Sequence, residues 1–198
     1  KSAILSYRFV CIFTYVVCPF LIVILWLISK VSISIFKFLS TYLFSVSLTC
    51  FLVSIFKYCC ERPLPDTLRV CDSVHTDVCS HYLQGYDLFA QFTSFPNRAA
   101  ADTMVIGVFL ALFLADTWRS DTMFSAVFKF VPICWAVYMG AIEIITRRAN
   151  PDDVIAGEMI GAFVSYFAFR SMKTGMLLDD TKNGYHKTSS VIPVNIYT

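Results

Sequence analysis

Five stretches of this sequence are apolar over nearly the length of a membrane-spanning helix, and they limit what the chain can fold into. A helix needs about 20 apolar residues to cross the hydrocarbon core of a bilayer. Hydrophobic residues make up 57% of the chain and charged residues only 15%, which a water-soluble domain of this size does not show. We therefore predict five membrane spans, at residues 9–28, 33–56, 103–117, 124–145 and 154–169.

These spans predict an all-α, polytopic membrane helix bundle in residues 1–170, followed by a tail at 171–198. The third and fifth spans are short, so we expect them to continue into neighbouring polar residues. Residues 57–102 form the one large polar segment between spans. The tail shows no sustained apolar period, and we expect it to be mobile or partner-bound. The net charge of +2 is too small and too scattered for a nucleic-acid-binding surface.

Polar residues gather in three clusters at the ends of the predicted spans: KYCCERPLP at 57–65, SFPNRA at 94–99 and RRANPDDVIAG at 147–157. In order, spacing and position, these clusters resemble the three signatures of the lipid phosphate phosphatase (PAP2) superfamily. The resemblance runs from the second span to the fifth. It implies a six-helix membrane bundle, of which five spans are visible here and the first is absent or precedes Lys1.

The first signature of that family is a lysine followed, after six residues, by Arg-Pro. Lys57 and Pro65 fall in register with it, but Leu64 occupies the place of the arginine. The resemblance therefore implies that one phosphate-binding cation is lost.

The second signature is Pro-Ser-Gly-His at the start of a helix, where backbone amides and the serine hold phosphate and the histidine protonates the leaving group. Here it reads Pro96, Asn97, Arg98, Ala99. Alanine carries no proton to donate, so the acid step has no evident donor at this position.

In the third signature a Ser-Arg pair precedes the nucleophilic histidine by five residues, and an aspartate four residues later orients that histidine. The positions in register are Ile142, Glu143, Ala149 and Asp153. The nucleophile is absent, its orienting aspartate is present, and a carboxylate replaces the arginine.

With Ala99 and Ala149 in place of both catalytic histidines, we predict a pseudophosphatase that resembles the phospholipid phosphatase-related proteins. We expect a lipid-binding, accessory or scaffold subunit of a membrane complex, with no cofactor, no metal site and no nucleic-acid partner. Anionic phospholipid and other membrane subunits are the expected partners. The cations that could hold such a lipid at one membrane face are Lys57, Arg62, Arg98, Arg147 and Arg148.

A plainer interpretation of these cations remains open. They could reach water at the interface, or pair with carboxylates such as Asp152 and Asp153. Glu143 could form an ion pair with Lys57 or Arg98, because an uncompensated charge at that depth is costly.

Two cysteines of the polar segment, Cys71 and Cys79, are predicted to form a disulfide, and the run from Asp66 to Cys71 also resembles the family's loop. A disulfide would place this segment outside the cell or in a secretory lumen, and the tail in the cytosol. We expect the plasma membrane, the endoplasmic reticulum or another secretory membrane. Zinc binding by these cysteines with His75 and His81 is a weaker alternative, since the spacing matches no common zinc finger.

Two other functions stay open. A divergent lipid phosphate hydrolase could use Asp152, Asp153 or Tyr58, although none has the neighbouring base that a nucleophile needs. A lipid transporter or scramblase would have charged residues within its spans, and the candidates here are Glu143, Glu158 and Lys129.

Overall fold

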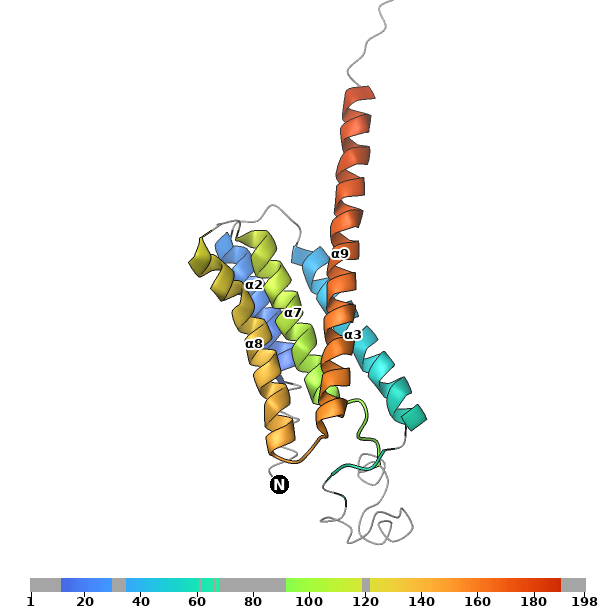
Figure 1. Ribbon diagram of the computed structural model, residues 1–198. Coiled ribbons are helices and arrows are strands. Elements are labelled where there is room, and N and C mark those ends of the chain that lie inside the picture. Colours follow the sequence, from blue (N-terminus) through green and yellow to red (C-terminus); the bar gives the residue numbers. More distant parts are fainter. Residues whose placement is uncertain are drawn as a thin grey trace, which may run out of the picture.

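The computed structural model describes residues 12–29, 35–60, 62–65, 67, 92–118 and 122–189 of the 198-residue chain. These residues form long helices and, within those ranges, no strand (Figure 1). The elements in chain order are a π-helical turn η1 (Phe13–Val17) and five α-helices: α2 (Cys18–Ser29), α3 (Ile35–Cys60), α7 (Arg98–Thr117), α8 (Met123–Ile145) and α9 (Pro151–Ser189). The predicted all-α bundle is confirmed.

Three of the helices, α3, α7 and α8, are long and apolar enough to cross a membrane. A shorter apolar stretch, Thr14–Ile24, runs through η1 and α2. Helix α8 exposes large apolar side chains along its length, including Phe124 at 76% and Ile145 at 78%. Hydrocarbon is the solvent that suits such a surface. The protein is therefore an integral membrane protein, as the sequence predicted.

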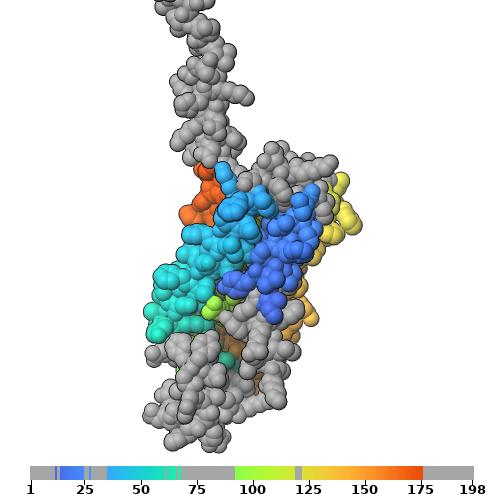
Figure 2. All heavy atoms as spheres, turned by 180° about the vertical axis from the view of Figure 1, so that it is seen from behind, coloured from blue at the N-terminus to red at the C-terminus, as the bar shows by residue number. Residues whose placement is uncertain are grey.

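Helix α7 lies at the centre of the bundle and packs against α3, α8 and α9. Aromatic rings from three helices meet around it. The rings of Phe38 and Phe113 pack edge to face with centroids 5.0 Å apart, and those of Phe109 and Phe169 with centroids 5.5 Å apart. Edge-to-face pairs stabilise beyond the area they bury. Figure 2 shows α3 and the η1–α2 segment side by side on one face of the bundle.

Two glycines allow α7 and α9 to approach each other closely. A Cβ atom on Gly157 would lie 2.3 Å from the carbonyl oxygen of Asn97, and one on Gly161 would lie 2.4 Å from that of Ala101. No side chain fits in this space. These two glycines are thus used for packing within the chain, and they bring the start of α9 against the start of α7.

Helices α7 and α9 are longer than the predicted spans. Helices α7 and α9 begin a few residues before the predicted spans, at Arg98 and Pro151, so they do continue into polar sequence as expected. Helix α9 also continues to Ser189 and projects beyond the bundle, where we expected a mobile or partner-bound tail (Figure 1). The sequence has no sustained apolar period there, but no proline follows Pro151 until Pro193, so no proline interrupts the helix.

Candidate functional site

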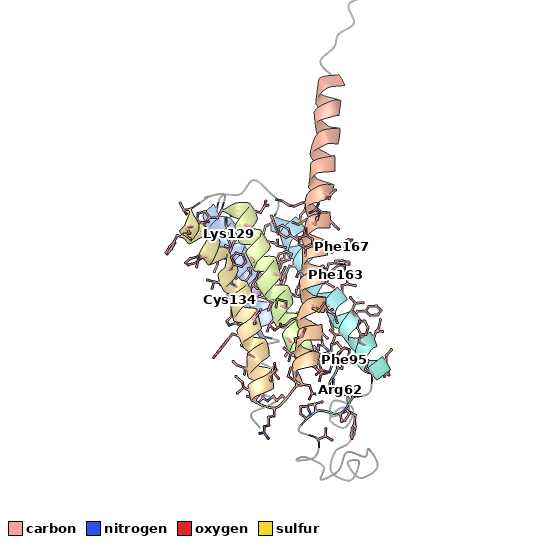
Figure 3. All side chains as sticks on the ribbon, in the orientation of Figure 1. Arg62, Phe95, Lys129, Cys134, Phe163 and Phe167 are labelled. Atoms are coloured by element: carbon pink, nitrogen blue, oxygen red, sulfur yellow. The ribbon has the colours of Figure 1, made fainter. Side chains whose placement is uncertain are left out.

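The three signature segments meet at one end of the bundle. The end of α3, the segment before α7 and the start of α9 come together there, and Figure 3 labels Arg62 and Phe95 at this end. Two backbone hydrogen bonds join the segments: the amide of Ser94 donates to the carbonyl of Arg62 at 2.8 Å, and the amide of Asn97 donates to the carbonyl of Asp153 at 2.9 Å. The structure therefore brings together the three segments that the sequence singled out.

Helix α9 begins with a complete set of initiation signals. Asn150 precedes the helix, and its carbonyl accepts the amide of Val154 at 3.2 Å. Pro151 occupies the first helical position, where a missing N–H costs nothing. The carboxylate of Asp153 accepts from the Asn150 side-chain amide at 3.1 Å and, more weakly, from its backbone amide at 3.4 Å. Both contacts run from Asn150 donors to the Asp153 carboxylate, which places its negative charge at the favourable end of the helix dipole.

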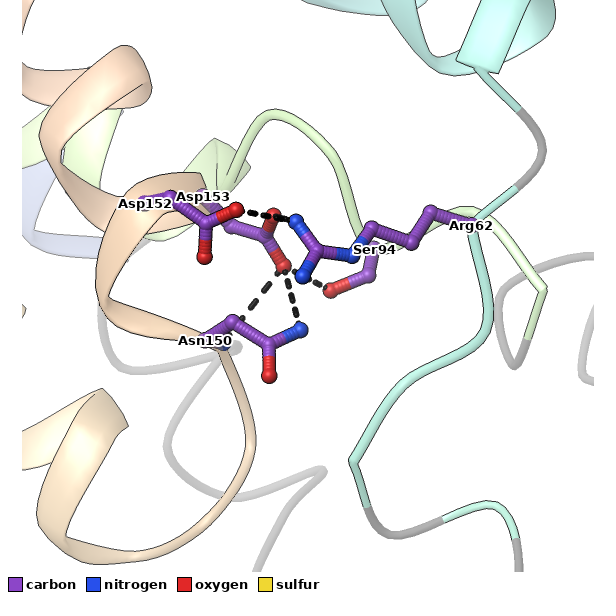
Figure 4. Close-up of polar contacts among 5 residues, drawn as sticks. All are labelled: Arg62, Ser94, Asn150, Asp152 and Asp153. Atoms are coloured by element: carbon purple, nitrogen blue, oxygen red, sulfur yellow. Dashed lines mark hydrogen bonds and ion pairs between the residues drawn. The ribbon is translucent and has the colours of Figure 1, made fainter.

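The carboxylate of Asp153 is fully buried and is the centre of the site (Figure 4). One oxygen accepts from Arg62 Nη1 at 2.9 Å. The other accepts from the hydroxyl of Ser94 and from Asn150. A buried charge is tolerated only when it is paired and hydrogen-bonded, and these three residues meet both conditions for Asp153.

Arg62 joins the polar segment to α9 through a second carboxylate. Its guanidinium donates to Asp152 as well as to Asp153. The hydrogen bond with Asp152 raises the pKa of Arg62, so the guanidinium remains charged. The Arg62 side chain is 41% exposed and the Asp152 side chain 60% exposed, so this outer contact is open to solvent.

Ala149 lies beside Asp153 in an apolar environment. It is only 3% exposed and packs in a cluster with Ala100, Val154 and the partly buried Ile144. Ala99 is half-buried in the first turn of α7. The two positions have no group that titrates.

Helix α8 ends in a Schellman motif that leads into this segment. The amide of Arg148 donates to the carbonyl of Glu143 at 3.0 Å, and that of Arg147 donates to Ile144 at 2.9 Å. Arg147 has a φ of 55°, the left-handed conformation that such a motif requires and that glycine adopts without strain. The chain therefore turns sharply between α8 and α9, with the Arg147 side chain exposed.

The other two cations of the predicted lipid site turn inward. Lys57 Nζ donates to the carbonyl of Thr93. Arg98 Nη2 contacts the sulfur of Cys50 at 2.8 Å, and its Nε lies 3.7 Å from the buried carboxylate of Asp102. Thus Lys57, Arg62 and Arg98 each contact acceptors within the protein, while no ion pair to Arg147 or Arg148 is found in the described part of the chain.

Comparison with known proteins agrees with this arrangement. Residues 38–176 match the model of the PAP2 superfamily. The chain belongs to the PAP2 superfamily. It is 26% identical over 147 residues to phospholipid phosphatase 2 of Mus musculus, an alignment that covers 69% of this chain and 53% of that protein. It is 27% identical over 143 residues to phospholipid phosphatase 2 of Homo sapiens, covering 67% and 50%.

This PAP2 chain spans about half the length of the curated relatives it matches. No solved structure matches it.

The PAP2 signature positions fall on defined structural elements. Leu64 lies in a turn in which its carbonyl accepts the amide of Thr67 at 3.1 Å. Asn97 caps α7, and its side chain accepts the amide of Ala100 at 2.8 Å. Ile142 and Glu143 lie near the end of α8 and are both half-buried. The ion pair between Glu143 and Lys57 or Arg98 stays a prediction.

The predicted Cys71–Cys79 disulfide lies outside the described residues, as do His75 and His81 of the zinc alternative. Cys59 and Cys60 at the end of α3 are exposed free thiols.

Sequence reasoning missed Ser94 and Asn150, both of which bind the Asp153 carboxylate. A signal for Asn150 was present. The run Asn150-Pro151-Asp152-Asp153 has a capping residue, a first-turn proline and two early carboxylates, which is the pattern of a helix start. Ser94 carried no such signal, because its partner is 59 residues away in the chain.

Proposed function

We propose that this chain is a non-catalytic member of the PAP2 superfamily that acts as a lipid-binding or accessory subunit in its membrane. The observation that carries the proposal is the set of contacts around Asp153. In the family pattern the aspartate at this position orients the nucleophilic histidine, and here Ala149 takes the place of that histidine. Asp153 instead accepts hydrogen bonds from Arg62, Ser94 and Asn150.

The apolar environment of Ala149 supports the same conclusion. A nucleophile must reach the phosphorus atom of its substrate, and the group at position 149 is buried against Ala100 and Val154. Ala99 supplies no proton for the leaving group. Leu64 and Glu143 supply no positive charge at the two arginine positions, and Glu143 would repel a phosphate.

A binding role is supported by the charges that remain at this membrane face. Arg147 and Arg148 follow the end of α8 at the interface, where cations attract anionic headgroups by about 1 kcal/mol each. Helix α8 presents a long apolar surface that lipid or another membrane subunit can cover.

The test is native purification, with mass spectrometry of the associated proteins and lipids and a phosphatase assay on the same material. Phosphatidate is the substrate probe, and a mock preparation gives the background. We expect no phosphate release above background, together with a stoichiometric partner protein or a defined lipid. A stable protein that carries neither would contradict the binding role.

A matched pair of variants tests the alternative that the chain is a divergent lipid phosphate hydrolase. Asp153→Asn changes the buried carboxylate, and Asp152→Asn changes its exposed neighbour. If the protein releases phosphate and Asp153→Asn alone abolishes the release in folded protein, the chain is a divergent hydrolase and the proposal is wrong.

A further inference from the structure

A hollow opens between α7 and α9 at the other end of the bundle from the Asp153 site. Its volume is about 240 Å³, and it is lined by Leu112, Asp116, Tyr166, Phe169, Arg170 and Lys173 among others. The first two residues belong to the last turns of α7, and the other four to α9.

The depth of this hollow follows from helix geometry. Arg170 is 17 residues beyond Asp153 on the same continuous helix, which corresponds to about 26 Å at 1.5 Å per residue. The hydrocarbon core of a bilayer is about 30 Å thick. If α9 crosses the bilayer with Asp153 at one boundary, this length places the hollow near the opposite boundary. Between the two ends, α9 exposes Phe163 and Phe167, whose rings stack with centroids 6.3 Å apart (Figure 3).

The hollow carries an uncompensated positive charge. Lys173 pairs with Asp116 across it. Arg170 Nη1 has a neutral partner, the hydroxyl of Tyr166, at 3.1 Å, and no carboxylate pairs with it among the described residues. With two cations and one carboxylate, the lining favours an anion.

The lining also matches the two parts of a phospholipid. Arg170, Lys173 and Tyr166 offer hydrogen-bond donors at the rim, and Leu112 and Phe169 offer apolar surface. Pockets that enclose a whole drug-sized ligand measure about 300–1,000 Å³. A hollow of about 240 Å³ is therefore suited to a headgroup whose acyl chains lie outside it, against α9.

We propose that this hollow binds the phosphate group of an anionic phospholipid in the leaflet opposite the Asp153 site. The guanidinium of Arg170 is the principal contact, because charge-assisted hydrogen bonds to phosphate are strong and geometrically specific. The ammonium group of Lys173 contacts both the Asp116 carboxylate and the lipid phosphate. This site shares no residue with the Asp153 site and does not depend on the function proposed for it.

The test is a titration of the purified full chain with phosphatidylglycerol, followed by native mass spectrometry, with phosphatidylcholine as the neutral comparison. Phosphatidylglycerol has a phosphodiester, so a phosphomonoesterase activity cannot consume it. We expect phosphatidylglycerol to bind more tightly than phosphatidylcholine. Arg170→Gln should weaken binding about tenfold, the effect of losing one hydrogen bond to a charged group.

Two further variants distinguish lipid binding in the hollow from attraction by the general surface charge. Lys129→Gln removes a cation from α8 at the same end of the bundle but outside the hollow, and should change affinity much less than Arg170→Gln. Asp116→Asn removes the competing carboxylate and should strengthen binding. Equal losses for Lys129→Gln and Arg170→Gln, or no gain for Asp116→Asn, would overturn the site.

Competition identifies the ligand. Millimolar inorganic phosphate should not displace phosphatidylglycerol if the lipid is held by headgroup and chains together. Displacement by inorganic phosphate would overturn the lipid assignment and make the hollow a site for free phosphate. Binding of a protein in place of lipid, lost in Arg170→Gln, would overturn it as well.

Discussion

The hydroxyl of Ser94 donates a hydrogen bond to the buried carboxylate of Asp153, across 59 residues of sequence. Both groups are buried, so the bond links the segment before α7 to the start of α9 where water does not compete.

Replacing Ser94 with alanine removes one donor from this buried carboxylate. We expect Ser94→Ala to destabilise the protein by about 1–3 kcal/mol, the cost of an acceptor that loses a partner away from water. Thermal unfolding in detergent micelles measures it. Ser54→Ala is the matched control, because among the described residues that hydroxyl bonds only the carbonyl of Cys50, within its own helix. Equal effects of the two changes would refute the assigned role.

Arg62 supplies the positive charge that balances Asp153. Arg62→Gln should destabilise the protein by about 2 kcal/mol or more, because it leaves a buried carboxylate with neutral donors alone. Asp152→Asn, which alters only the exposed partner of Arg62, should have a much smaller effect in the same unfolding assay. A larger destabilisation by Asp152→Asn than by Arg62→Gln would show that the outer pair of Arg62 with Asp152, and not the contact with Asp153, stabilises the fold.

Arg147 is held in the left-handed conformation at the end of α8. Arg147→Gly should stabilise the protein by about 1 kcal/mol, because glycine adopts this conformation without the steric cost that a Cβ atom brings. Arg148→Gly should give no such gain, since Arg147 alone has a positive φ among the described non-glycine residues. Destabilisation by Arg147→Gly would mean that a contact of the arginine side chain stabilises the protein by more than the relief of backbone strain does.

Restoring a histidine at position 149 tests whether the site can regain chemistry. Ala149→His should destabilise the protein by about 1–3 kcal/mol, because the ring must enter the apolar cluster formed with Ala100 and Val154. We expect no phosphate release from phosphatidate by this variant. Full stability together with phosphate release would show that the site has room for both a histidine at position 149 and a substrate.

The glycines of α9 offer a sharp comparison within one helix. Gly157→Ala should destabilise by about 1–3 kcal/mol, since the new Cβ atom would lie 2.3 Å from the carbonyl oxygen of Asn97. Gly175→Ala meets nothing within 4 Å and should stabilise the helix by up to about 1 kcal/mol. If unfolding measurements show both variants to be more stable than the parent protein, or both less stable, the close contact between α7 and α9 is contradicted.

The sequence predicted the all-α bundle, because apolar length is a local property, and it singled out the three segments that the structure brings together. It predicted less well how the cations are used. Lys57, Arg62 and Arg98 could each face lipid or protein, and only the positions of Thr93, Asp153 and Asp102 in space distinguish the two. The continuation of α9 to Ser189 was also missed, because that part of the sequence has no apolar period to recognise.

The contact between Asn150 and Asp153 stabilises the start of α9, whatever residue occupies position 149. A chain of this architecture that loses its aspartate loses these contacts at the helix start as well as an orienting carboxylate. An aspartate at this position has a part in folding, so its presence does not by itself indicate that a chain turns over a substrate.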